Sequence, residues 1–199
     1  MERRDLLKSA LALGAIGLTA PVGATPAPTD GTPLQFMPKA APDADPLKDE
    51  LKKYPKCPYC GMDRTQFHHS RHLVQYADNL VDGTCSLHCL AISLSLNIDR
   101  GPKAIWAADY GATDAVKPML DVDKATYLVG SGLPGVMTGR SKKAFATPEA
   151  ARDAQAKHGG ETGDFSYALQ AAYADMARDT ISIRKRREEM RRRKMEKQG

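Results

Sequence analysis

The four cysteines of this chain lie close together in the sequence, and they constrain its fold more than any other feature. They form two pairs, Cys57-Pro-Tyr-Cys60 and Cys85-Ser-Leu-His-Cys89, within 33 of the 199 residues. A Cys-x-x-Cys segment followed by glycine is typical of a metal-binding knuckle, because glycine tolerates the dihedrals of the tight turn. The 24 residues between Cys60 and Cys85 leave room for a hairpin-like excursion that returns the chain. We therefore expect the two pairs to meet.

The second pair lies at the start of a predicted helix, and its spacing directs both thiols to one side of the first turn. A helix N-terminus favours thiolate, so the two pairs can close a tetrahedral zinc site. Met62 adds a thioether directly after the first pair. Zinc has little use for a thioether, whereas Cu(I) is bound well by thiolate and thioether together. The residues favour Cu(I), with a structural Zn(II) site made by all four cysteines as the alternative.

Two further interpretations of the cysteines are weaker. Cys-Pro-Tyr-Cys is the redox tetrapeptide of glutaredoxins, which would make the chain a thiol-disulfide oxidoreductase. In that fold, however, the motif follows an apolar strand and opens a helix, whereas charged residues precede Cys57 and Gly61 follows Cys60. Two structural disulfides would close only small loops, which contribute little stabilisation. The chain also lacks a Ser-His-Asp arrangement, a phosphate-binding glycine loop and paired catalytic carboxylates, so we expect no enzymatic activity.

The N-terminal 50 residues are predicted to lie outside the folded body. Residues 1–24 combine a charged start containing Arg3 and Arg4, a short apolar run and small residues up to Ala24. This pattern predicts an export signal of the twin-arginine type, cleaved near Ala24, and hence a periplasmic protein. Residues 25–50 contain six prolines and no sustained apolar period, which is typical of a tether.

The net charge of +5 is unevenly distributed. The signal contributes +1 and residues 184–199 contribute +6, so the body from 25 to 183 carries −2. A mildly acidic body with one basic tail is not a nucleic-acid surface. The tail is either a solvated helix end or a contact for an anionic membrane surface or an acidic partner.

The periodicity of the remaining sequence predicts an α+β fold. It consists of two small strand-and-helix units (ββαβ-like), at 51–112 and 113–163, and a long amphipathic helix with a basic tail at 164–199. The first unit contains CxxCGM and CxxxC and is the metal-binding one. We expect strands at 72–77, 104–109, 125–129 and 143–146, and helices at 86–97 and 148–158.

The segment Cys57-Pro-Tyr-Cys-Gly-Met62 resembles the signature of the NosL family, the copper chaperones that help to mature nitrous oxide reductase. Three later segments are also similar to that family: Trp106-Ala-Ala-Asp-Tyr110, Tyr127-Leu-Val-Gly-Ser131 and Val136-Met-Thr-Gly139. The resemblance implies a Cu(I) carrier that passes its ion to a recipient metalloenzyme. It implies Cys60 and Met62 as the principal ligands, Cys57 as a further or alternate one, and Met137 as a ligand from the second unit.

The second pair departs from the simpler members of that family. Cys85 and Cys89 resemble the helix-start pair of TRASH and YHS-like metal modules. They either form a separate zinc site with Cys57 and Cys60 or enlarge the copper site. His88 lies between them and is the best-placed histidine. For His68, His69 and His72, exposed loop or edge-strand positions are favoured over metal ligation.

Overall fold

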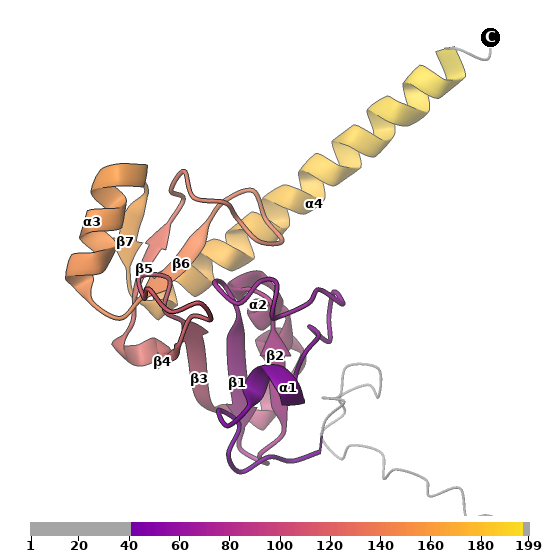
Figure 1. Ribbon diagram of the computed structural model, residues 1–199. Coiled ribbons are helices and arrows are strands. Elements are labelled where there is room, and N and C mark those ends of the chain that lie inside the picture. Colours follow the sequence, from indigo (N-terminus) through magenta and orange to yellow (C-terminus); the bar gives the residue numbers. More distant parts are fainter. Residues whose placement is uncertain (1–40, 197–199) are drawn as a thin grey trace, which may run out of the picture.

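The computed structural model describes residues 41–196 (Figure 1). The predicted export signal and its cleavage position at Ala24 lie outside these residues, as does most of the predicted tether. The described part contains two small antiparallel sheets and four α-helices, of which the last is long and C-terminal. This confirms the predicted α+β class.

The first sheet carries the N-terminal part of the fold. Its strands are β1 (His72–Tyr76), β2 (Val81–Thr84), β3 (Pro102–Ala108) and β4 (Met119–Asp121), in the spatial order β2-β1-β3-β4. Helix α2 (Leu87–Leu96) connects β2 to β3, and the short helix α1 (Glu50–Lys53) precedes the sheet. Single 3₁₀ turns follow α2 at Ile98–Arg100 and β4 at Val122–Lys124.

The second sheet repeats the connectivity of the first. Strands β5 (Thr126–Val129), β6 (Lys142–Phe145) and β7 (Glu161–Gly163) lie in the order β6-β5-β7, and α3 (Pro148–His158) connects β6 to β7. In both sheets the first strand is central, the second and third flank it antiparallel, and a helix joins the flanking strands. The two units thus share a ββαβ order although no repeat is visible in their sequences.

The predicted boundaries of α3 are confirmed, together with their physical cause. The Thr147 hydroxyl accepts a hydrogen bond from the backbone N–H of Ala150 at 3.2 Å, and Pro148 occupies the first helical position. Gly159 ends the helix with a left-handed φ of 67°, a conformation that glycine adopts without strain.

One hydrophobic core joins the two units. Val74 and Tyr76 of β1 and Leu90 of α2 pack in the same buried cluster as Tyr127 and Val129 of β5. Helix α4 (Phe165–Glu196) covers this cluster with its first three turns and packs against α2 and β5. Figure 1 shows α4 continuing well beyond the body of the molecule. Between residues 41 and 196, no helix has the length and apolar character needed to cross a bilayer.

Strand β6 buries a lysine whose ammonium group lies against an aromatic ring. Lys143 is 1% exposed, and its Nζ atom lies over the Tyr110 ring at 5.0 Å from the centroid. Burial lowers the pKa of Lys143 to about 8. Because an exposed lysine has a pKa near 10.4, the unfolded chain binds more protons than the folded chain between these two values. The free energy of unfolding therefore rises with pH through this window. Below it, Lys143 is protonated in both states and contributes no pH dependence.

We expect Lys143→Met to remove this dependence. The free energy of unfolding of the wild type, minus that of the variant, should rise by about 2 kcal/mol between pH 8 and 9.5 and stay flat between pH 6 and 7.5. Urea denaturation across this range measures the difference, in which the titrations common to both proteins cancel. A difference that does not change with pH would contradict a buried lysine with a lowered pKa.

Candidate metal centre

The first cysteine pair lies in a tight knuckle that its backbone holds closed. The N–H of Gly61 donates to the carbonyl of Cys57 at 2.9 Å, and the N–H of Cys57 donates to the carbonyl of Met62, also at 2.9 Å. Gly61 has a φ of 76°, and an added Cβ there would meet nothing within 4 Å, so the turn needs glycine for its dihedral rather than for space. Because the motif forms a turn and not the start of a helix, it lacks the feature that activates a glutaredoxin thiol.

The second pair lies where β2 passes into α2. Cys85 follows the last residue of β2, Ser86 is the N-cap of α2, and Cys89 is the third residue of the helix. The corresponding positions of the second unit, before and after the Thr147 cap, are Ala146 and Ala150. The repeated topology therefore carries thiols at this helix start in the first unit only.

The two pairs meet, as the sequence predicts. All four Sγ atoms lie within 4.8 Å of one another, with Cys60 and Cys85 at 3.5 Å and Cys85 and Cys89 at 3.8 Å. Four thiolates about 2.3 Å from a tetrahedral ion lie about 3.8 Å apart, which fits this spacing. All four thiols are free. The cluster can thus hold one soft ion, and it is too compact to divide into two separate sites.

The sulfur cluster is open on one side. Cys57, Cys85 and Cys89 are at most 2% exposed, whereas Cys60 is half-buried. Met62 is also half-buried, and its Sδ lies 3.9 Å from the Cys85 Sγ. A recess of about 420 Å³ runs beside the knuckle and is lined by Lys53, Lys56, Cys57, Gly61 and Asp82, among others. Access to the sulfurs is therefore easiest at Cys60 and Met62.

Met137 is less closely placed. Its neighbour Val136 packs against the sulfur cluster, but Met137 itself is 41% exposed and has a left-handed φ of 67°. Val136 brings the turn between β5 and β6 over the start of α2. Met137 therefore lies one residue from the side chain that packs on the cluster.

The ion-free cluster favours a single thiolate. Hydrogen bonds from the thiols of Cys85 and Cys89 lower the pKa of Cys57, and donating these bonds raises the pKa of Cys85 and of Cys89. Four thiolates cannot share this buried volume without a cation, because their mutual repulsion is not screened by water. Binding a metal ion therefore releases protons, and the affinity rises with pH.

A buried polar chain supports the knuckle from behind. The hydroxyl of Tyr59, between the first two cysteines, donates to Asp82 of β2, and the Ser93 hydroxyl reaches the same carboxylate at 2.7 Å. The Tyr76 hydroxyl bonds to Ser93 at 2.6 Å. Burial is the largest effect on Asp82 and raises its pKa. The sequence analysis missed these residues, since nothing in their spacing distinguishes them from surface residues.

The side chain of Arg64 connects the two cysteine segments. Its guanidinium is fully buried and donates to three main-chain carbonyl oxygens, those of Tyr54 (2.6 Å), His72 (3.2 Å) and Thr84 (3.2 Å). Tyr54 leads into the knuckle, and Thr84 directly precedes Cys85. Gly83 makes this possible, because a Cβ there would lie 2.7 Å from the Arg64 Cζ.

The charge of Arg64 is balanced by Glu50 of α1. The two side chains pair at 2.7 Å, and Arg71 donates to the other Glu50 oxygen at 2.6 Å. All three residues are less than 9% exposed. Glu50 is the anion that two guanidiniums share, so its removal would cost several kcal/mol, because both buried cations would lose their compensating charge. We name Glu50, Arg64 and Arg71 the ion triad.

The histidines divide into different environments. His72 is wrongly predicted as an edge or loop residue: it lies in the central strand β1, is 2% exposed and bonds to Tyr127 at 3.1 Å. Burial lowers the pKa of His72 to about 3, so it stays neutral. His68 accepts a hydrogen bond from the Lys117 N–H at 3.1 Å, and His69 lies edge-on to Tyr110. His88 lines a small cavity with Arg140 and Lys142 over the start of α2.

We expect Arg64→Ala to lower the free energy of unfolding by about 3–5 kcal/mol, because it leaves three carbonyls unpaired and empties the volume of a fully buried side chain. The matched control is Arg152→Ala on the exposed face of α3, where the pair with Glu149 lies in water and the change should stay within about 0.5 kcal/mol. Urea denaturation of the reduced, chelator-treated proteins measures both. Similar values for the two variants would show that the triad does not hold the site.

One protein-family model covers the whole metal centre. The family model of NosL matches residues 48–172, from α1 to the first turns of α4, a span that includes all four cysteines. Among solved structures, the chain is similar to the copper chaperone NosL from Shewanella denitrificans, at 24% sequence identity and a TM-score of 0.49. That match covers 58% of this chain and 90% of the other. No curated protein matches significantly.

Proposed function

Because the chain belongs to the NosL family, we propose that it is an exported protein that binds Cu(I) and delivers it to a recipient metalloenzyme, nitrous oxide reductase. The observation that carries the proposal is a compact cluster of four free thiols with a half-exposed cysteine and methionine at its open side. The recipient rests on the family resemblance. Export to the periplasm rests on the sequence of residues 1–24.

The donor set supports Cu(I). Thiolates and a thioether are soft ligands, which select Cu(I) over harder divalent ions, and a thioether contributes little to zinc. Met62 lies within 4 Å of a cluster sulfur, so it can complete a shell that one or more cysteines begin. We propose Cys60 and Met62 as the principal ligands and Cys57 as an alternate one. Cys85 and Cys89 enlarge the same site, and Met137 approaches when the turn that carries it closes.

Delivery requires that a partner's ligands reach the ion before the chain's own ligands release it. Cys60 and Met62 offer that approach, because both are half-buried while the other three sulfurs are covered. The recess beside the knuckle gives a partner loop room next to Cys57. Transfer then proceeds by ligand exchange, one sulfur at a time, and needs no catalytic turnover.

The alternative function is a zinc-stabilised binding module in which the cysteines are structural. The observation that favours it is the near-complete burial of Cys57, Cys85 and Cys89, in a spacing that suits a tetrahedral four-thiolate site. The ion triad argues against it. Arg64 already joins the two cysteine segments through main-chain carbonyls, so the fold does not need an ion to bring them together.

The ligand role of Met62 distinguishes the two functions. We expect Met62→Leu to weaken Cu(I) binding by at least about tenfold, because leucine keeps the volume but removes the soft donor. Met190→Leu, at an exposed position on α4, is the matched control and should leave the affinity unchanged. Competition between the reduced protein and a chromophoric Cu(I) chelator measures both.

Thermal denaturation accompanies that titration, so that a loss of affinity is not confused with a loss of folding. If Met62→Leu binds Cu(I) as tightly as the control variant, Met62 is not a ligand. Equal affinity together with zinc that copurifies and resists chelation would support the structural alternative.

A further inference from the structure

The end of α4 is a free-standing basic helix that the proposed metal function does not use. Every residue from 180 to 196 is exposed, and the family match ends at residue 172. At 1.5 Å per residue this segment is about 25 Å long. Residues 184–196 contain eight lysines and arginines and three glutamates. Within this segment Arg192 forms an ion pair with Glu196 at 3.7 Å.

The charges are not distributed evenly around the helix. Ile183 and Met190 are seven residues apart and therefore lie on one side, and four basic residues occupy the positions three and four residues from them. We name this set the basic face: Ile183, Arg186, Arg187, Met190, Arg193 and Lys194. Five of these side chains line one shallow groove together with Glu189.

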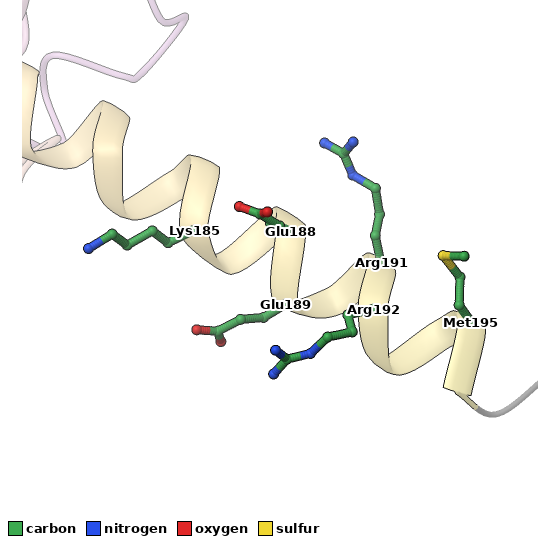
Figure 2. A pocket seen from close by; sticks show the side chains of 6 residues that line it. All are labelled: Lys185, Glu188, Glu189, Arg191, Arg192 and Met195. Carbon is green, nitrogen blue, oxygen red and sulfur yellow. The ribbon is translucent and has the colours of Figure 1, made fainter.

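The opposite side of the helix carries mixed charge. Figure 2 shows Lys185, Glu189 and Arg192 projecting to one side of α4, where positive and negative groups alternate. Glu188 and Glu196 also lie away from the line through Ile183 and Met190, at 3.6 residues per turn. The basic face carries four cations, and the carboxylate at its edge is Glu189, three residues after Arg186 and four before Arg193, so positive charge predominates there.

We propose that the basic face binds the surface of an anionic phospholipid bilayer, with the helix axis parallel to it. A flat, densely negative surface can neutralise all four cations at once. The groove along the face is shallow, so it gives little hold for the side chains of a folded partner. Ile183 and Met190, 41% and 62% exposed, lie in the middle of the face and can enter the layer below the headgroups. The aliphatic stems of arginine and lysine beside them suit that boundary.

Two other occupants fit the face less well. A second copy of the helix would place Arg186 and Arg193 against their counterparts, since these arginines flank the short apolar line, and like charges at a helix interface repel. An acidic protein would meet mobile guanidiniums, because residues 180–196 are all exposed and α4 continues beyond the body there (Figure 1). Each such contact would cost the full side-chain entropy.

The test compares two double variants of equal net charge in the full-length protein. Arg186→Gln with Arg193→Gln removes two cations from the basic face, and Lys185→Gln with Arg192→Gln removes two from the opposite side. The readout is cosedimentation with vesicles of phosphatidylcholine containing one third phosphatidylglycerol, at low salt. Vesicles of phosphatidylcholine alone are the lipid control.

We expect the wild type to bind the anionic vesicles and not the neutral ones, and binding to fall as salt rises. Each basic residue near the surface contributes about fivefold to binding, so the basic-face variant, which lacks two, should bind at least about tenfold more weakly. The control variant should lose about threefold or less, because its charges lie about one helix diameter from the lipid.

Equal losses in the two variants, or no binding of the wild type, would overturn the proposal. Binding to poly-glutamate without binding to vesicles would assign the face to an acidic protein instead. Cu(I) affinity, measured in parallel, should be the same in all three proteins. The lipid proposal can therefore fail without affecting the metal function, and the reverse also holds.

Discussion

The arrangement of the site depends on one buried guanidinium. Arg64 joins two segments that are 24 residues apart, because it donates to the carbonyls of Tyr54, three residues before Cys57, and of Thr84, directly before Cys85. It also donates to the carbonyl of His72 in strand β1. Its charge is stable in the interior because the Glu50 carboxylate lies beside it, and that carboxylate also pairs with Arg71. The sulfurs are therefore assembled by an ionic and main-chain network that is independent of any bound ion.

The proposed delivery of an ion requires this arrangement, because three of the thiols are buried and the fold must persist when the ion leaves. In a small zinc domain the metal supplies much of the folding free energy, so the ion cannot leave without unfolding the chain. Here the core that β1, α2, β5 and α4 share supplies that energy. The second unit repeats the same connectivity with alanines at the cysteine positions, and it serves to complete the core and to carry the turn of Val136 and Met137.

The sequence predicted the parts of this structure that depend on local pattern. The cysteine spacing predicted the sulfur cluster, and the cap at Thr147 and Pro148 predicted α3. Strands β2, β4 and β7 were missed, because each is only three or four residues long and is defined by its partners rather than by alternation. Glu50, Arg64, Asp82 and His72 were missed or misplaced for a related reason. Polar residues are expected at the surface, and only tertiary pairing allows these to be buried.

The central claim is that the fold precedes the metal. The most direct test is thermal denaturation of the reduced protein, followed by near-ultraviolet circular dichroism, first without metal and then with one equivalent of Cu(I) under anaerobic conditions. The account predicts that the metal-free protein is folded, melts cooperatively and gains only a modest increase in Tm from Cu(I). A metal-free protein that has no tertiary signal, and that folds only when zinc is added, would contradict it.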